Sequence, residues 1–495
     1  MVFNSLDFLI FFPIVVLVYF IIPSKFQRIW LLLASYYFYM SWNPKYIVLI
    51  VFVTVVTYFF ARAIDILDRV DGNKGIAGKR ICLVGSILAN LSLLVLFKYA
   101  NLAIGYINKV LEIFHVELIE KTFDYALPVG ISFFTFQALG YIIDVYRGAC
   151  AEKNFIQYAL FIAFFPQLVA GPIERSKNLL KQVNQTHQFN YERVKNGLLL
   201  MLWGFFLKVV LADRVAIFVN SVYADPYRYP GFFIIVATIL FAFQIYGDFC
   251  GYSTIARGGA RVLGFELMEN FQSPYLSLNV AEFWRRWHIS LSGWFRDYLY
   301  IPLGGNRKGK FRQYLNLMIV FLASGLWHGA SLSFMLWGAL NGIYQIIGDI
   351  CKPTKQKLVQ IFSFDITRRE HKVFCSLTTF ILVDIAWFFF RAGSISNVIT
   401  MCKQMVWESN LWIFFDGSLY EAGLSRQEFG VMLIAIALML WVDSLHLRNI
   451  HVLSILEKSG LIFRTLVVGG LIYIVVMLGA YGGDYGASTF IYFTF

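Results

Sequence analysis

The amino-acid sequence predicts an all-α protein that crosses a membrane many times, with about eleven spanning helices and additional re-entrant or interfacial helices. Hydrophobic residues occupy 59% of the 495 positions and charged residues only 15%, a balance that excludes a soluble globular domain. Apolar runs long enough to cross a bilayer recur from one end of the chain to the other. The sequence shows no internal repeat, low-complexity segment or linker, so we expect one transmembrane domain covering residues 1–495.

The predicted spans are apolar runs separated by short polar or basic segments. Residues 8–22 form the first span, and they lack the basic segment and cleavage site of a removable signal peptide. Residues 81–114 are too long for one crossing and contain Lys98, so one long tilted helix and two separate elements both remain open. Residues 155–170 precede Gly171-Pro172, which favours a re-entrant element or a sharp helix end. The other predicted spans are 29–42, 46–60, 127–146, 198–210, 232–248, 373–390, 431–447 and 463–481.

Charge and cysteine usage indicate how the chain is oriented. Basic residues are concentrated in the segments 62–80, 307–312 and 352–372, which the positive-inside rule places in the cytoplasm with the N-terminus outside. The net charge of +12 is therefore interpreted as loop charge that sets orientation, and not as a nucleic-acid surface. The six cysteines have neither disulfide nor zinc spacing and are interpreted as inert core residues.

Residues 280–298 carry charge and aromatic rings in an amphipathic helical pattern. Asn279 is placed to cap this helix, and Glu282 is placed to complete a capping box. The polar face holds several arginines, which cannot face lipid, so the helix is expected to lie along the membrane surface or to line a polar cavity. Arg285 and Arg286 are interpreted as headgroup or loop anchors. His288 falls at the edge of the apolar stripe, which consists of Val280, Phe283, Trp284, Trp287, Leu291, Trp294, Phe295 and Tyr298.

A short hairpin follows this amphipathic segment. Its first arm, residues 314–326, would be about 20 Å long as a helix, which is too short for a hydrocarbon core of about 30 Å. The second arm, residues 332–347, returns after Gly325, Trp327, His328 and Gly329. We therefore expect His328 at a turn buried within the bilayer, where an ionisable group is a candidate functional residue by default.

Six motifs carry a resemblance to a known family. They are L-P-V-G-I-S-F-F-T-F-Q (127–137), F-F-P-Q-L-V-A-G-P-I-E-R (164–175), Q-I-Y-G-D-F-C-G-Y-S (244–253), W-R-R-W-H-I-S-L-S-G-W-F-R-D-Y-L-Y-I-P-L-G-G-N-R-K-G (284–309), L-W-H-G-A (326–330) and F-I-Y-F-T-F (490–495). In this order the chain resembles the membrane-bound O-acyltransferase (MBOAT) family, in particular its bacterial branch of alginate and peptidoglycan O-acetyltransferase membrane subunits. Cys250 and Thr254 depart from the serine and aspartate usual there, which leaves the role of 250–254 open.

The resemblance implies an MBOAT fold around a central tunnel in the bacterial cytoplasmic membrane. It implies transfer of an acetyl group from a cytoplasmic thioester, acetyl-coenzyme A, for O-acetylation of an extracytoplasmic polysaccharide. Alginate, peptidoglycan, cellulose and other exopolysaccharides all remain open as the acceptor. Such proteins commonly work with a periplasmic or extracellular acetyltransferase partner. His328 matches the essential histidine of the family, and His288 matches a second, supporting position.

The residues themselves suit acyl transfer to an alcohol. The reaction needs a base, a group that stabilises the developing oxyanion, and a site that excludes water. A buried His328 stays neutral and can accept a proton, and His288, Arg296 or Asn306 can meet the second need. A tunnel narrowest at His328 is expected, with His288 near the same cavity. The candidate substrate-binding residues are Trp287, Arg296, Asp297, Asn306, Trp327, Tyr246 and Asp248.

The alternatives to this interpretation are a zinc site and a transporter or channel. A zinc site formed by His288, His328 and Asp297 lacks ligand spacing, so no metal and no bound cofactor are expected. The alternative function is a transporter or channel without covalent chemistry, in which the buried charges line a permeation path. That alternative predicts paired broken helices in inverted halves, whereas the sequence shows one broken hairpin. The enzyme is therefore preferred.

Overall fold

The structure, a computed structural model, describes residues 1–69, 73–119, 128–169, 171–363 and 365–481. Within these ranges the chain forms helices and connecting turns, with no β-strand, which confirms the predicted all-α class. The chain divides into two compact units. Unit 1 consists of Met1–Leu198 and Ala256–Met268, and unit 2 consists of Leu199–Ile255 and Glu269–Phe495. The single domain expected from the sequence stays a prediction.

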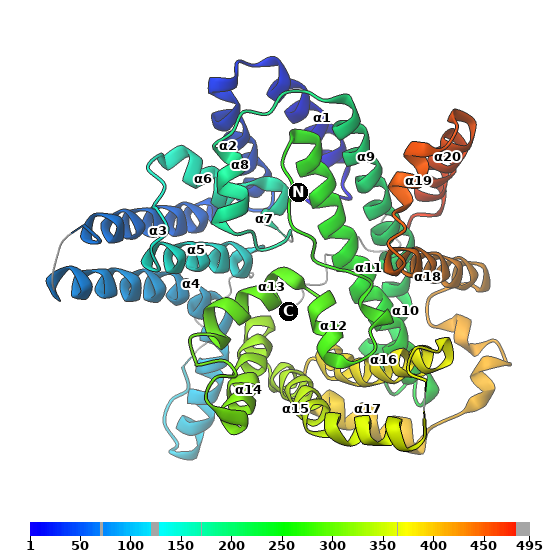
Figure 1. The fold of residues 1–495 in the computed structure, drawn as a ribbon. Helices are drawn as coiled ribbons and strands as arrows, with labels where there is room; N and C mark the ends of the chain where they lie inside the picture. Colours follow the sequence, from blue (N-terminus) through cyan, green and yellow to red (C-terminus); the bar gives the residue numbers. More distant parts are fainter. Residues whose placement is uncertain (70–72, 120–127, 170, 364, 482–495) are drawn as a thin grey trace. The chain divides into compact units, whose positions relative to one another are not determined.

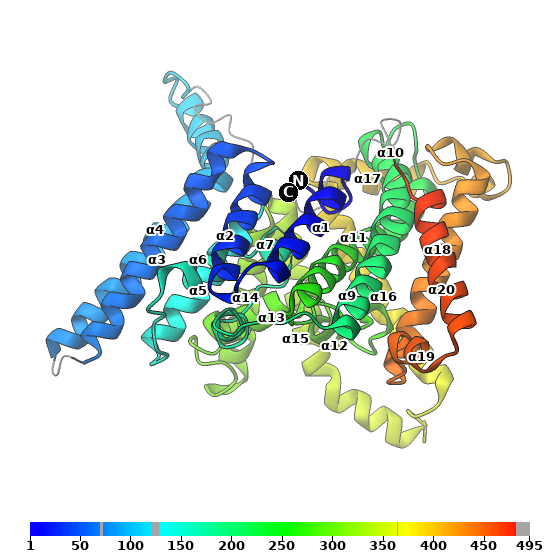
Figure 2. The same ribbon diagram turned by 90° about the horizontal axis from the view of Figure 1, so that it is seen from above.

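The helices of unit 1 begin at the N-terminus. In chain order they are α1 (Leu6–Ile21), α2 (Ser24–Met40), η1 (Pro44–Tyr46), α3 (Ile47–Leu67), α4 (Asn73–Ile113), α5 (Ile131–Tyr146), α6 (Phe155–Ala163), α7 (Phe165–Leu168), η2 (Ser176–Leu180) and α8 (Lys181–Val183). Two of the boundaries between the units fall inside α9 (Tyr191–Phe205) and α11 (Phe232–Leu263), and the third follows Met268, after α11 has ended. Figure 2 shows α3 and α4 side by side along much of their length.

Helix α4 decides what residues 81–114 form and where the basic residues of 62–80 lie. The run 81–114 is one continuous helix, because α4 extends over 41 residues. The prediction of a long basic loop over 62–80 is wrong, since α3 continues to Leu67 and α4 already begins at Asn73. Residues 70–72 of that segment lie outside the described residues. Its basic side chains therefore sit mostly on the last turns of one helix and the first turns of the next.

The predicted span 155–170 is broken in the middle. Helix α6 has 9 residues, about 14 Å of helix, so it cannot cross a bilayer alone. Phe164 leaves the helical conformation with ψ 107°, and the N–H of Phe165 donates to Ser35 Oγ at 3.1 Å. A second short helix, α7, then begins with Pro166 in its first turn. Ala170, like Leu127 and the terminal motif 490–495, lies outside the described residues.

Unit 2 holds the helices that carry the candidate site (Figure 1). After α9 they are η3 (Phe206–Ala212), α10 (Asp213–Ala224), α11, η4 (Pro274–Leu276), α12 (Val280–Arg286), α13 (Ile289–Phe295), η5 (Arg296–Tyr300), α14 (Gly309–His328), α15 (Leu332–Ile361), α16 (Arg369–Ala392), α17 (Ile395–Trp407), η6 (Leu411–Phe414), η7 (Ser418–Glu421), α18 (Arg426–Leu447), α19 (Val452–Lys458) and α20 (Leu461–Leu478).

Helices α14 and α15 form the predicted hairpin, packed side by side (Figure 1). Glycines make this close approach possible. A Cβ on Gly325 would lie 2.4 Å from the carbonyl oxygen of Phe334, and a Cβ on Gly338 would lie 2.4 Å from that of Phe321. The predicted arm lengths are wrong, because α14 has 20 residues, about 30 Å of helix, and α15 has 30. The first helix already begins inside the basic segment, at Gly309, and the second continues well past residue 347.

Six helical segments among the described residues are long and apolar enough to cross a membrane. They are Pro44–Leu67, Asn73–Ile113, Phe232–Leu263, Arg369–Ala392, Arg426–Leu447 and Leu461–Leu478. Leu6–Ile21 and Ile131–Tyr146 are apolar but shorter. The membrane character predicted from composition is confirmed, whereas the number of about eleven spans stays a prediction.

Candidate active site

His328 is the last residue of α14 and lies at the turn of the hairpin, as the sequence predicts. Its side chain is buried, with the residue 5% exposed. Three aromatic rings surround the imidazole. The ring of Trp337 on α15 lies 5.1 Å away between centroids, that of Phe390 on α16 lies 5.2 Å away, and that of Trp327 lies 4.8 Å away. Two helices and the preceding residue thus fix this imidazole in an apolar environment.

His288 lies at a break in the segment predicted as one helix over 280–298, so that prediction is wrong. Helix α12 ends at Arg286, and α13 begins only at Ile289. His288 takes the left-handed conformation, with φ 43° and ψ 53°, which is uncommon for a residue with a side chain. The predicted cap is confirmed, because Asn279 Oδ1 accepts from the N–H of Glu282 at 2.9 Å. Glu282 Oε2 in turn accepts from the N–H of Leu278 at 2.9 Å.

Asn270 stabilises this break from outside the two helices. Its carbonyl oxygen accepts from the N–H of Ile289 at 3.0 Å, and its side-chain Oδ1 accepts from the N–H of Ser290 at 3.2 Å. Asn270 is itself 1% exposed and donates to Ser253 Oγ at 3.4 Å. The first N–H groups of α13 therefore have partners only because a distant segment supplies the acceptors.

The two histidines belong to one cluster. The ring of Trp327 lies 6.1 Å from the His288 ring and 4.8 Å from the His328 ring, and Phe249 lies 4.6 Å from His288 on another side. His288 is 1% exposed. Its burial lowers the pKa of the imidazole from 6.5 to about 3, because an apolar environment disfavours the charged ring. His288 is therefore neutral at physiological pH.

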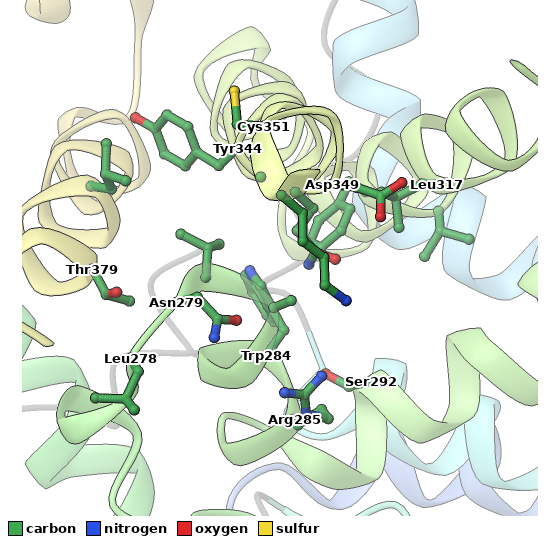
Figure 3. A pocket seen from close by; sticks show the side chains of 18 of the residues that line it. Leu278, Asn279, Trp284, Arg285, Ser292, Leu317, Tyr344, Asp349, Cys351 and Thr379 are labelled. Carbon is green, nitrogen blue, oxygen red and sulfur yellow. The ribbon is translucent and has the colours of Figure 1, made fainter. Parts of the chain in front are cut away.

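A cavity of about 980 Å³ opens beside this cluster (Figure 3). Its walls come from α12 to α16, and Figure 3 shows Trp284, Arg285 and Ser292 facing Tyr344 and Asp349 across it. Four basic residues, Arg285, Arg296, Lys352 and Lys355, line it. Neither histidine is among the lining residues. The expected tunnel through His328 stays a prediction.

Two tryptophans connect the cavity to His328. Trp284 lines the cavity, and its ring lies 5.6 Å from that of Trp337, which packs on His328. Trp284 Nε1 donates to Asn341 Oδ1 at 3.1 Å, which fixes the orientation of the indole. The ring of Trp337 thus lies in contact with both Trp284, in the cavity wall, and the His328 imidazole.

The predicted substrate-binding residues fall in several places. Arg296 lines the cavity and forms an ion pair with Asp297 at 2.8 Å. Asn306 is exposed in the turn before α14, away from the lining residues. Trp327 lies between the two histidines. Trp287 is buried, with its ring 5.1 Å from that of Trp387.

Tyr246 and Asp248 are committed to buried polar contacts. Tyr246 donates its hydroxyl to the carboxylate of Asp443, at 2.9 and 3.1 Å to the two oxygens. Asp248 pairs with Lys208 at 2.7 Å, and Lys208 also pairs with Asp213 at 2.8 Å. Neither residue lines the cavity.

The sequence interpretation missed several residues of this region. Trp337 packs on His328 and Asn270 accepts from the first N–H groups of α13, yet nothing in the local sequence marks these two residues. Phe390 packs on His328 as well. Arg285 lines the cavity, and its interpretation as a headgroup or loop anchor stays a prediction. Arg286 forms an ion pair with Glu282 at 2.7 Å. The i, i+3 spacing of Trp387 and Phe390, both aromatic and both buried, was a usable signal for a helix face turned toward this site. Across the described residues, no group of three or more His, Cys, Asp or Glu could hold a metal ion.

The family model described as "MBOAT, membrane-bound O-acyltransferase family" matches residues 149–367. The protein named "Probable alginate O-acetylase AlgI" from Pseudomonas putida is 38% identical over 410 residues, covering 82% of this chain and 80% of the relative. "Peptidoglycan O-acetyltransferase" from Helicobacter pylori is 35% identical, covering 80% of this chain and 78% of the relative. "Teichoic acid D-alanyltransferase" from Streptococcus thermophilus is 28% identical, covering 45% of this chain and 56% of the relative. The chain belongs to the membrane-bound O-acyltransferase family.

Proposed function

We propose that this membrane-bound O-acyltransferase transfers an acetyl group from a cytoplasmic thioester to hydroxyl groups of an extracytoplasmic polysaccharide. The observation that supports this most directly is the pair of buried histidines that both pack on Trp327, one of them at the turn of the α14–α15 hairpin. The relatives are named as acetyltransferases of alginate and peptidoglycan, which makes acetyl the proposed group and a polysaccharide the proposed acceptor.

His328 is the proposed general base. A neutral imidazole accepts the proton of the attacking hydroxyl, and the surrounding rings of Trp327, Trp337 and Phe390 exclude water that would otherwise hydrolyse the donor. His288 is neutral as well, so its proposed role is to donate or accept a hydrogen bond and not to supply a positive charge. Trp327, which contacts both histidine rings, is proposed to hold the His288 ring near the hydroxyl and the acyl group that react at His328.

The cavity is the proposed entry for the donor. Its basic residues Arg285, Lys352 and Lys355 provide the positive charge that a phosphorylated thioester such as acetyl-coenzyme A needs. Its volume of about 980 Å³ is in the range of sites that enclose a cofactor-sized molecule. Trp284 in the cavity wall and Trp337 behind it then separate the donor from His328. A movement of these indoles would bring the acyl group to the imidazole.

The donor and the acceptor are proposed to reach the protein from opposite faces of the membrane. The basic segments 307–312 and 352–372 face the cytoplasm, so the cavity mouth near Lys352 faces the donor and the N-terminus lies outside. A polysaccharide is delivered to the opposite face, where a periplasmic or extracellular acetyltransferase partner completes the transfer. Membrane lipids surround the chain, and nucleic acid has no role.

The test replaces His328 in cells that make the polysaccharide. In His328→Ala the acetate released from the polymer by mild alkali should fall at least about a hundredfold, the scale of a lost general base. The control is His451→Ala, because His451 is exposed and precedes the short helix α19. The control should acetylate normally, and both proteins should reach the membrane in equal amounts. Near-normal acetate in the His328→Ala polymer would contradict the proposal.

A further inference from the structure

One thiol in the cavity wall has a base and a cation beside it. Cys375, on α16, lines the cavity. Its Sγ lies 3.5 Å from Nε2 of His371, one turn earlier on the same helix, and 3.9 Å from Nζ of Lys355 on α15. Two helices therefore bring a nucleophile, an imidazole and an ammonium group together at the edge of the cavity.

These three groups are the parts that activate a cysteine. The thiolate is the reactive form, and a positive charge next to sulfur favours it. An imidazole within hydrogen-bonding reach takes the thiol proton. Cys351 lines the same cavity, but it is exposed whereas Cys375 is buried. Figure 3 shows the side chain of Cys351 across the cavity from Arg285 and Ser292.

We propose that Cys375 is an acyl-accepting thiol that forms a thioester with the acyl group of a donor bound in this cavity. The inference rests on the proposed function in one respect, namely that the cavity admits an acyl thioester. No motif of the sequence analysis includes Cys375, and neither the base His328 nor its aromatic neighbours take part.

The step exchanges one thioester for another. Cys375 Sγ attacks the carbonyl carbon of the donor thioester while His371 Nε2 takes the thiol proton. The tetrahedral intermediate collapses, the bond from that carbon to the donor sulfur breaks, and the proton passes from His371 to the departing thiolate. One C–S bond forms and one breaks, with no oxidation or reduction. The acyl group then stays on the cavity wall after the donor thiol has left.

Lys355 is a positioning residue in this step. Its ammonium group, on the neighbouring helix α15, lies 3.9 Å from the sulfur, and its proposed role is to offset the negative charge that develops there during the attack. Lys355→Met should slow acylation by about tenfold or more, whereas Lys355→Arg keeps the charge and should restore most of the rate. A structural role for Lys355 would not distinguish Arg from Met in this way.

The experiment uses the full-length protein in detergent, with radiolabelled acetyl-coenzyme A and radiolabelled S-acetylpantetheine as probes. The wild type should gain acetyl that neutral hydroxylamine releases, and peptide mass spectrometry should place it on Cys375. Cys375→Ser should lose at least about tenfold of this label, and His371→Gln should slow its appearance by a similar factor. The control Cys402→Ser, which changes an exposed cysteine outside the cavity wall, should label like the wild type.

The outcomes separate this inference from the proposed function. Polymer acetylation by a wild-type protein that carries no acetyl on Cys375 with either probe would overturn the inference alone. Equal labelling of Cys351 and Cys375 would also overturn it, because the neighbouring His371 and Lys355 would then make no difference. Acetyl on Cys375 in a protein whose polymer acetylation does not depend on His328 would overturn the proposed function alone.

Discussion

Two buried imidazoles pack against one indole in this protein. His328 and His288 are 5% and 1% exposed, and aromatic rings form most of their immediate surroundings. For His288 this burial lowers the pKa of the imidazole, because an apolar environment favours the neutral ring over the charged one. A neutral histidine is the form that a general base requires.

The lowered pKa of His288 predicts how stability depends on pH. In the folded protein the ring stays neutral down to about pH 3, whereas in the unfolded chain it binds a proton below about pH 6.5. Between these values the unfolded state holds the extra proton, so the free energy of unfolding falls as pH falls, by up to about 1.4 kcal/mol for each pH unit. The melting temperature in detergent should therefore decrease from pH 6.5 to pH 4.

His288→Gln should show a shallower decrease over the same range, since glutamine has no proton to bind. His451→Ala, which changes an exposed histidine, should keep the wild-type dependence. If the melting temperature of His288→Gln depends on pH as that of the wild type does, the folded protein does not lower the pKa of His288.

The two short helices α12 and α13 depend on a neighbour more than on their own sequence. Residues 280–298 have one continuous amphipathic pattern, which favours a single helix. The structure interrupts it at His288, and Asn270 provides two acceptors to the N–H groups that the interruption leaves without helical partners. The break turns the His288 ring toward Trp327 and Phe249.

Asn270→Ala tests this dependence. The substitution removes the acceptor of the Ser290 N–H in a buried place, which should lower the free energy of unfolding by about 1–3 kcal/mol. It should also lower polymer acetylation, because α13 loses a side-chain acceptor two residues after His288. The matched control is Gln272→Ala, whose exposed side chain bonds only to Glu269 among the contacts described. Equal stability and activity of Asn270→Ala and the control would show that α13 holds its place without this residue.

The proposed membrane orientation of the chain rests on the positions of its basic residues. Segments 307–312 and 352–372 flank the α14–α15 hairpin, so both ends of the hairpin are expected on the cytoplasmic face. Helix α16 is a candidate span, and it would then carry the chain to the outside before α17.

Cysteine labelling in intact cells tests this orientation. In a chain whose six native cysteines are replaced, Lys308→Cys and Lys357→Cys should resist a membrane-impermeant maleimide until the cells are permeabilised. Glu408→Cys, exposed after α17, should react from outside and serves as the positive control. Reaction of either lysine position in intact cells, at the rate of the control, would reverse the proposed orientation.

The sequence by itself determined the class of the protein and the approximate place of its helices. Hydropathy is a property of consecutive residues, so the membrane character and spans such as α16 and α18 could be predicted to within a few residues. The cap at Asn279 and the turn at His328 were also local, because a capping side chain and flanking glycines act on their immediate neighbours. The two histidines could be singled out for the same reason, as ionisable groups in apolar surroundings.

Tertiary structure alone decided how these residues meet. Asn270 breaks the helix at His288 from 18 positions away, and Trp337 and Phe390 reach His328 from two other helices. Tyr246 and Asp248 looked like groups for a polar wall, but Asp443 and Lys208 bind them in the interior. The cavity, with Lys355 beside Cys375, likewise exists only where α15 and α16 pack. Apart from that of Trp337 with His328, each of these contacts joins segments at least 18 positions apart, and a local pattern holds no information about which distant segment will supply the partner.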